Sequence, residues 1–400
     1  MSAAPLTTPA RHTETGPHGQ DTSSNGGESR TPAQSRSERF SSFDVADFAT
    51  VTGKEAEWRL SPIDRFQSLL SGTLDGSPYD LEVDKTEGVE VEWIGRESES
   101  IGRAGTPEDR ASANAWSTFE KALAIRIEGN VPTATIVRRG GFGSTPRAAH
   151  TTISAAPFSS AIVIFEHTGD ALLAENVEIL LGNGAHLTVV TVQEWNDVAV
   201  HLSSHIASVG RDASLKHVVV SLGGAVVRVS PTAHLMGAGS NADLFGLYFA
   251  DAGQHLEQRV YVDHVAPNTR SRVNYKGALR GAGARTVWIG DVLIGRGAVG
   301  TDSYEQNRNL LLTDGARADS VPNLEIENGD ILGAGHASAT GRFDDEQLFY
   351  LQSRGIAENE AKKLVVRGFL TEIVQHIGVS EIETHLLDAI EAELFEARAS

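Results

Sequence analysis

The sequence predicts a mainly β protein with a parallel β-helix core and a helical region on each side of it. The stretch 151–342 is rich in Val, Leu, Ala and Gly, and its short alternating apolar runs end in Gly, Asn or Asp. A weak motif also recurs inside this stretch at a nearly constant interval, which fits a coiled parallel sheet better than a sandwich. Few helix signals interrupt the stretch, so a βαβ fold is not expected.

The recurring motif consists of four apolar positions at offsets 0, 2, 5 and 7. Its three clearest copies are Ala185, Leu187, Val190 and Val192; Ala213, Leu215, Val218 and Val220; and Ala242, Leu244, Leu247 and Phe249. The copies follow one another at steps of 28 and 29 residues, and weaker copies are expected at 283–286 and 315–318. A step of two keeps side chains on one face of a strand. The single step of three predicts a bend or bulge between two short strand pieces.

The segment before the core divides into two predicted regions. Residues 1–40 are rich in Ser, Thr, Pro, Gly and Gln and almost lack large apolar groups, so we expect a disordered tail. Residues 41–150 are expected to form a helical and mixed N-terminal region. In it, Ser61 is placed to cap a helix that begins at Pro62 and ends at Gly72.

Residues 343–400 are predicted to form a C-terminal helical domain. A first short helix is expected over 344–353. Apolar residues spaced four apart predict a second helix, with its buried stripe at Val365, Phe369, Ile373 and Ile377. Ser380 and Glu383 then form a capping box for a last helix. Three short helices after a β core suggest a docking domain.

The composition restricts the classes of partner and chemistry. Lys and Arg total 34 against 53 Asp and Glu, and the net charge of −19 disfavours nucleic acid and anionic membranes as partners. The chain has no cysteine, so it offers no disulfide, no thiolate metal ligand and no cysteine nucleophile. No apolar run approaches the ~18 residues of a membrane span, and the N-terminus lacks a signal-peptide pattern. We therefore expect a cytoplasmic protein.

Two short patterns resemble sites but are better explained by structure. Residues 295–300 match G-x-G-x-x-G, yet no helix is expected after the last glycine, so turn glycines of the β-helix explain them better. His201 and His205 stand four apart in a predicted strand, where such residues share a face but lie roughly 13 Å apart. They are interpreted as structural or surface histidines. Carboxylate pairs of a polysaccharide-active enzyme would form across turns of a β-helix, so that alternative stays open.

His336 is the candidate metal ligand. It lies between the predicted β region and the C-terminal helices, among small residues that leave its ring accessible. Imidazole binds iron and replaces thiolate at some iron–sulfur centres. The residues alone leave a plain loop histidine as the alternative.

The C-terminal third carries a family resemblance. Its motifs are similar to a series typical of the SufB/SufD family, and a weaker match precedes them in the N-terminal region; the matching segments are Tyr304–Leu312, Val321–Ile326, His336, Asp345–Ile356 and Trp58–Pro62. The resemblance spans roughly residues 55–400 and implies a right-handed parallel β-helix flanked by helical regions. It also implies a scaffold for iron–sulfur cluster assembly that catalyses nothing alone. A homodimeric structural protein is a further alternative.

The resemblance implies specific partners and site residues. The absence of cysteine favours the SufD-type subunit, which pairs with a cysteine-containing SufB-type subunit. A SufC-type ATPase binds the C-terminal helices, and the candidate contacts are Phe349, Tyr350, Ser353, Arg354 and Phe369. Sulfur comes from a desulfurase system, a transient iron–sulfur cluster is shared with the partner, and a reduced flavin is associated with the complex. His336 matches the SufD histidine that faces the SufB cysteine, although the family commonly has Gly at position 337 and often Cys at 334, where this chain has Ala.

Overall fold

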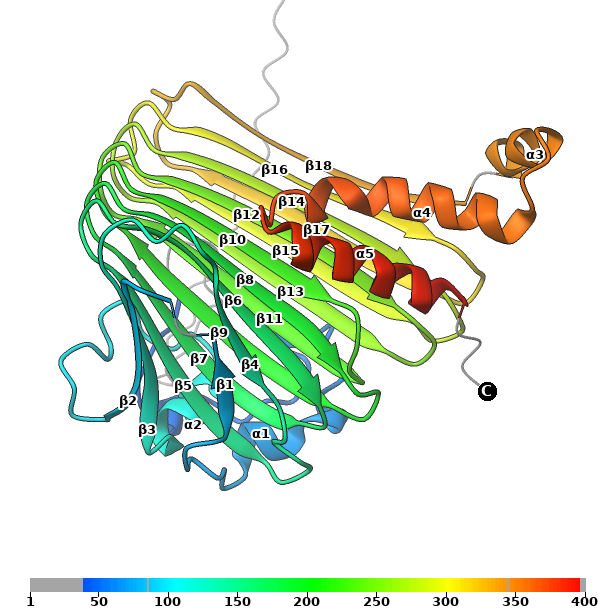
Figure 1. Ribbon diagram of the computed structural model, residues 1–400. Helices are drawn as coiled ribbons and strands as arrows, with labels where there is room; N and C mark the ends of the chain where they lie inside the picture. Colours follow the sequence, from blue (N-terminus) through cyan, green and yellow to red (C-terminus); the bar gives the residue numbers. More distant parts are fainter. Residues whose placement is uncertain (1–38, 85, 344, 396–400) are drawn as a thin grey trace, which may run out of the picture. The chain divides into compact units, whose positions relative to one another are not determined.

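The computed structural model describes residues 39–395 except 85 and 344. The predicted disordered tail, 1–40, therefore lies outside the described residues apart from its last two positions. The chain winds through two nine-stranded sheets, and most consecutive strands belong to alternate sheets (Figure 1). All strand pairs are parallel except β1 with β4 and β2 with β3. The predicted parallel β-helix is confirmed.

The first sheet contains, in spatial order, β1 (Leu81–Val83), β4 (Thr135–Arg139), β6 (Ser160–Gly169), β8 (His186–Trp195), β10 (Ser214–Ser221), β12 (Asn241–Ala250), β14 (Arg270–Leu279), β16 (Asp302–Leu311) and β18 (Gly333–Arg342). The second sheet contains β2 (Val89–Gly95), β3 (Lys121–Ile127), β5 (Arg147–Ala155), β7 (Leu172–Leu181), β9 (Val200–Val209), β11 (Val226–Leu235), β13 (His255–His264), β15 (Arg285–Ile294) and β17 (Arg317–Ile326). The β-helix strands thus begin with β3, inside the range predicted as the N-terminal region.

The repeat motif reflects strands that are buried on both faces, and the predicted bend is wrong. In β10, Leu215 and Val219 join the core between the sheets, whereas Val218 and Val220 join a second cluster with the C-terminal helices. The pairing of β8 with β10 runs on without a break. The step of three in the motif therefore marks a change from the inner to the outer face of one continuous strand.

The third copy of the motif pairs two residues away from the predicted position. Leu215 pairs with Ala242, and Val220 pairs with Leu247. A slip of two residues leaves every side chain on its own face, so apolar alternation alone cannot choose between the two registers. The weaker copies at 283–286 and 315–318 do align with each other, as Arg285 pairs with Arg317, but they belong to the second sheet.

The N-terminal segment covers the outer face of the second sheet. It contains the 3₁₀ turns η1 (Val45–Asp47) and η2 (Ile63–Arg65) and the helices α1 (Gln67–Ser71) and α2 (Arg110–Thr118). Trp58, Phe66 and Leu70 pack against strand residues such as Leu202. The predicted Ser61 cap is wrong, because Pro62 precedes η2 without a side-chain bond. Ser61 Oγ instead donates to Glu257 Oε2 of β13 at 2.7 Å, which ties the segment to the sheet.

The C-terminal helices are α3 (Asp345–Ser353), α4 (Glu358–Val374) and α5 (Ser380–Phe395). Helices α4 and α5 lie on the outer face of the first sheet (Figure 1). The buried residues of α4 are Ala361, Val366, Leu370, Ile373 and Val374, so its buried stripe lies about one residue away from the predicted positions 365 and 369. Lys276 Nζ of β14 donates to Glu372 of α4 at 2.6 Å.

Candidate functional site at the last end of the β-helix

Strands β17 and β18 are the terminal strands of the two sheets on the C-terminal side. We call the region they form the last end of the β-helix. Each strand is ten residues long and, within the described residues, pairs along one edge only. The other edge offers a row of backbone donors and acceptors to a further strand. Exposed apolar side chains accompany it: Leu332 is 82% exposed and Ile326 45%. This end has the features of a surface that another chain could continue.

The inner row of β16, next to β18 at the last end, is polar. Four alternate residues of β16 point inward and are buried: Ser303, Glu305, Asn307 and Asn309. Tyr248 OH donates to Asn309 Oδ1 at 2.8 Å and accepts from Asn307 Nδ2 at 2.7 Å. Burial raises the pKa of Tyr248 well above its ordinary value. A polar inner face that is internally hydrogen-bonded is stable when another layer covers it.

His336 continues this inward-facing row onto the next strand. It belongs to β18 and stands opposite Glu305 in the parallel register, so it is a strand residue and not a loop histidine. Its Nδ1 is 3.8 Å from Glu305 Oε1; the histidine side chain is 46% exposed and the carboxylate 1%. Ala334 and Ser338, two positions away on each side, are small. The ring is therefore accessible from the open edge of β18.

His336 and Glu305 together provide at most an imidazole and a carboxylate. Among the described residues, no group of three or more His, Cys, Asp or Glu side chains is arranged to hold a metal ion. Glu305 was not singled out by the sequence patterns, although it lies in the motif beginning at Tyr304. Only the strand register shows that it stands opposite His336.

Four of the five predicted partner contacts lie in or next to α3, and the fifth lies elsewhere. Phe349 is 71% exposed, and Tyr350 and Arg354 are also exposed, with the guanidinium 5.1 Å from the tyrosine ring centre. Ser353 Oγ donates to the Tyr350 carbonyl at 2.7 Å. Phe369 is half-buried on α4, where Lys276 Nζ lies 5.0 Å from its ring centre. Helix α3 is thus the exposed part of the set.

The two histidines of β9 are structural. His201 Nε2 lies 2.8 Å from Glu175 Oε1, and Arg139 Nη2 lies 2.7 Å from the other oxygen. Burial raises the pKa of Glu175, but Arg139 and His201 outweigh burial and hold it well below its usual range. Burial lowers the pKa of His205 to about 4. The glycines at 295–300 form the turn between β15 and β16, as predicted.

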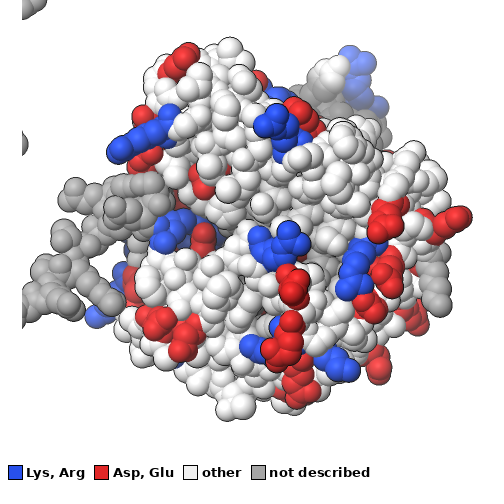
Figure 2. All heavy atoms as spheres, turned by 90° about the vertical axis from the view of Figure 1, so that its left-hand side faces the viewer, with Lys and Arg blue, Asp and Glu red and all other residues white. Residues whose placement is uncertain are grey.

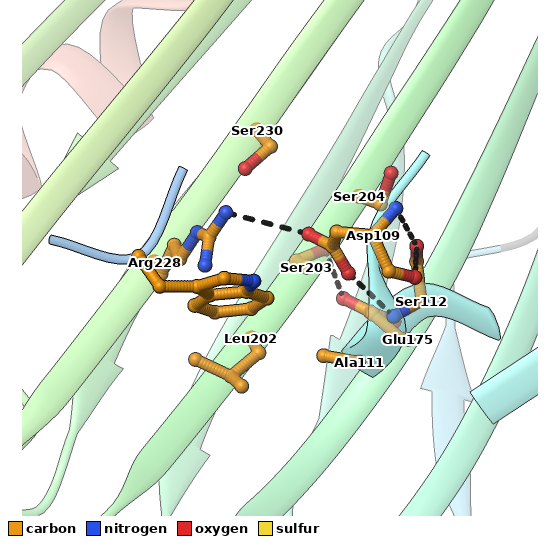
Figure 3. A pocket seen from close by; sticks show the side chains of 10 residues that line it. Asp109, Ala111, Ser112, Glu175, Leu202, Ser203, Ser204, Arg228 and Ser230 are labelled. Carbon is orange, nitrogen blue, oxygen red and sulfur yellow. Dashed lines mark hydrogen bonds and ion pairs between the residues drawn. The ribbon is translucent and has the colours of Figure 1, made fainter. Parts of the chain in front are cut away.

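A small polar pocket lies where the N-terminal segment meets the second sheet. Figure 3 shows Arg228 directed at Asp109, and Ser203 directed at Glu175. The Arg228 guanidinium also stacks on Trp58 at 3.8 Å. The cavity measures about 10 Å³, which is room for no more than one water molecule. It is a packing feature and too small for a ligand.

The surface charge is mixed. On the face shown in Figure 2, acidic and basic side chains lie in small mixed groups. The described residues on this face form no continuous basic patch. In the part of the chain that the structure describes, none of the helices is both long and apolar enough to span a bilayer.

The family model and the similar proteins all indicate the same family. The family model described as "SUF system FeS cluster assembly, SufBD core domain" matches residues 139–369. An iron–sulfur cluster assembly SufBD family protein of Mycobacterium leprae is 47% identical over 365 residues, covering 89% of this chain and 93% of its own length. A Mycobacterium tuberculosis H37Rv relative with the same description is 47% identical over 373 residues, covering 90% of this chain and 94% of its own. A second M. leprae SufBD family protein is 31% identical over 211 residues, covering 53% of this chain but 24% of its own length.

Proposed function

The chain belongs to the SufBD family of iron–sulfur cluster assembly proteins, and from that premise we propose that it is the SufD-type scaffold subunit of the assembly complex. In this role it catalyses no reaction alone. It pairs with a cysteine-containing SufB-type subunit and carries a SufC-type ATPase in the cytoplasm. The observation that carries the proposal is the last end, where two ten-residue parallel edges flank an accessible histidine.

The absence of cysteine supports the SufD-type assignment. A nascent cluster needs thiolate or sulfide ligands that this chain cannot supply. The complementary subunit must therefore bring the thiolates, and two unequal SufBD family proteins do occur together in M. leprae. Strand-by-strand pairing at β17 and β18 would bring the partner's residues beside His336.

In this arrangement His336 contributes one imidazole to the cluster, which is the substrate of assembly. Glu305 Oε1 lies 3.8 Å from its Nδ1, which is beside the ring but outside hydrogen-bond distance. Sulfur arrives from a desulfurase system through the partner, and a reduced flavin acts at the level of the complex. Nucleotide-driven closure of the ATPase, seated on α3, would strain the paired edges and open the site near His336.

Co-expression with the neighbouring genes tests the proposal. We expect an ATPase and a cysteine-containing paralogue to co-purify with the full-length chain. Recovery of the chain as a homodimer alone, or with activity on a polysaccharide, would contradict the scaffold role.

His336→Ala tests the ligand role. We expect the variant to assemble with both partners but to mature iron–sulfur enzymes poorly in vivo. His186→Ala is the matched control, because His186 is an exposed histidine of the same sheet at the start of β8. Normal enzyme maturation by His336→Ala would remove the histidine from the site.

The double variant Phe349→Ala, Tyr350→Ala tests the ATPase seat. A deletion of the whole C-terminal domain would also uncover the apolar outer face of the first sheet, so it cannot separate binding from folding. The two α3 residues are exposed, and their loss should leave the melting temperature unchanged while the ATPase no longer co-purifies. Retained binding would place the ATPase elsewhere.

A further inference from the structure

The turn that joins β17 to β18 contains an asparagine followed by a glycine, Asn328-Gly329. The sequence has two more such pairs: Asn183-Gly184, in the turn between β7 and β8, and Asn25-Gly26, which lies outside the described residues. In an Asn-Gly pair the backbone nitrogen of the glycine can attack the asparagine side chain, because glycine has no Cβ to hinder the approach. Whether the attack occurs in a folded protein depends on how firmly the pair is held.

The Asn183-Gly184 pair is held by the turns on both sides of it. Gly184 N–H donates to the Arg211 carbonyl at 2.8 Å, and Asn183 Oδ1 accepts from the Arg211 N–H at 3.0 Å. On the other side, the Asn183 carbonyl accepts from Phe158 N–H at 3.0 Å. Attack by the Gly184 nitrogen therefore requires that at least one backbone hydrogen bond is broken first.

The nitrogen of Gly329 is not held in this way. Among the described residues, Gly329 N–H has no hydrogen-bond acceptor. Gly329 is exposed, and a Cβ placed on it would meet no atom within 4 Å. Asn328 itself is half-buried. The attacking nitrogen is thus available in the folded chain, and water reaches it.

The side chain of Asn328 is folded toward the residues that follow it. Asp330 N–H donates to Asn328 Oδ1 at 2.9 Å, and this bond closes a ring that contains the Gly329 nitrogen. The same donor would stabilise the negative charge that develops on Oδ1 during attack at Cγ. Asn328 Nδ2 donates to the Arg296 carbonyl at 3.3 Å, longer than an ordinary hydrogen bond, so the leaving group is weakly held.

We propose that Asn328 is a site of spontaneous deamidation. The Gly329 nitrogen loses its proton and forms a bond to Asn328 Cγ, while the Cγ–Nδ2 bond breaks and ammonia leaves with that proton. Water then opens the cyclic imide, at one carbonyl to give aspartate and at the other to give isoaspartate. Nothing is oxidised or reduced in these steps, and water is the only other reactant.

Both products alter the last end of the β-helix, and the consequence for partner binding rests on the proposed function. Each product adds a negative charge next to Glu327 and near Asp330, and each removes the donor to the Arg296 carbonyl. Isoaspartate also inserts a carbon atom into the main chain between β17 and β18. This displaces the residues up to Leu332, whose side chain is 82% exposed beside the open edges. Deamidation should therefore weaken pairing with a second subunit as the chain ages.

Peptide mapping by mass spectrometry tests the modification without any partner. The purified full-length chain is incubated in mildly alkaline buffer, which promotes loss of the Gly329 amide proton. We expect Asn328 to deamidate about 2- to 10-fold faster than Asn183, the equivalent of the hydrogen bond that holds Gly184. Gly329→Ala places a Cβ beside the nitrogen and should slow the reaction at Asn328.

Incubation in guanidinium is the control, because unfolding releases both pairs and the two rates should converge. An aged folded chain in which Asn328 is unmodified, or reacts no faster than Asn183, would overturn the proposal. So would an unchanged rate in Gly329→Ala, provided that its melting temperature matches that of the parent chain.

The effect on pairing is measured separately with Asn328→Asp, which introduces the aspartate product directly. Asn183→Asp is the matched control, since it places the same charge in an Asn-Gly turn away from the last end. We expect the Kd for the cysteine-containing paralogue to rise about 2- to 5-fold in Asn328→Asp alone, the range of a single exposed charge. An unchanged Kd would overturn the effect on pairing, whereas no binding by the parent chain would contradict the proposed function instead.

Discussion

The two ends of the β-helix differ in strand length, strand direction and the chemistry of their inner face. At the end opposite β17 and β18, which we call the first end, β1 and β2 have three and seven residues, run antiparallel to their neighbours and turn apolar side chains inward. At the last end, β17 and β18 have ten residues each and run parallel to their neighbours. The inner row of β16 beside β18 is polar, whereas β15 beside β17 turns Trp288 and Val292 onto the apolar core.

This difference indicates which end of the β-helix another chain could continue. At the last end, another strand can supply backbone groups to the open edges of β17 and β18. At the first end, the inner side chains of β1 and β2, such as Val83 and Val91, are apolar and half-buried. The same fold therefore ends once in long open edges suited to another chain and once in short antiparallel strands over an apolar inner face.

The largest effect should come from the interior charge near the first end. Arg139 of β4 is buried and pairs with Glu175, so Arg139→Met leaves the buried carboxylate without its guanidinium and with only His201 and Ser203 beside it. We expect a loss of about 3–5 kcal/mol in the free energy of unfolding, measured by guanidinium denaturation. Arg138→Met is the control, because its partially exposed ion pairs with Asp84 and Glu166 should contribute about 0–1 kcal/mol. Equal losses in both variants would mean that the buried ion pair contributes no more to stability than the exposed one.

Acid should destabilise the protein through histidines buried in the neutral form. Burial lowers the pKa of His205 and of His264 to about 4 each, whereas the unfolded chain protonates near 6.5. Above pH 6.5 both states are neutral, so stability is constant with respect to these groups. Between 6.5 and 4 only the unfolded state gains the protons, and stability falls by up to about 3 kcal/mol per histidine.

Denaturation curves at pH 7 and pH 5 test this dependence. In His205→Gln the loss of stability between the two pH values should be smaller than in the parent chain. In His186→Gln it should be unchanged, because His186 is exposed. An identical pH dependence in all three proteins would rule out His205 as a source of acid sensitivity.

Charges placed at the last end should weaken pairing with the paralogue. Ile326→Asp combined with Leu332→Asp introduces two carboxylates among exposed apolar residues beside the open edges. We expect at least a tenfold rise in Kd, measured by sedimentation of the purified pair, because interface anchors typically contribute more than 1 kcal/mol. Val198→Asp with Met236→Asp is the matched control on exposed apolar residues elsewhere and should leave Kd unchanged. Equal weakening by both double variants would indicate a nonspecific effect of charge.

The smallest effect concerns Thr135. Replacing a buried, unpartnered hydroxyl with a methyl group in Thr135→Val should be neutral or stabilising by up to about 1 kcal/mol. Thermal unfolding of the purified chain measures this. A clear destabilisation would mean that the hydroxyl already has a partner within the protein.

Apolar periodicity predicted the parallel β-helix but not its register. Alternation of side chains has a period of two, so it placed Leu215 on the correct face and its partner two residues away from Ala242. The outward apolar residues, such as Val218, were interpreted as a bend because the sequence does not reveal that α4 and α5 cover that face. Contact with these two helices explains the outward apolar residues, which the spacing in the sequence had assigned to a bend.

The candidate site was only partly predictable, because contacts between neighbouring strands are not visible in the sequence. His336 was recognisable from the surrounding motifs, and its exposure agrees with the small residues beside it. Its neighbour Glu305 is 31 positions away in sequence and becomes a neighbour only through the strand register. The closing of the first end also depends on bringing β1 and β2 to the edges of different sheets, which no local pattern encodes.

Amide hydrogen exchange tests the contrast between the two ends most directly. The purified chain is compared with its complex with the cysteine-containing paralogue, and exchange is followed by mass spectrometry in peptides covering β17, β18, β1 and β2. We predict strong protection of 317–326 and 333–342 in the complex and unchanged exchange of 81–83 and 89–95. Protection of the first end with no change at the last end would contradict the account.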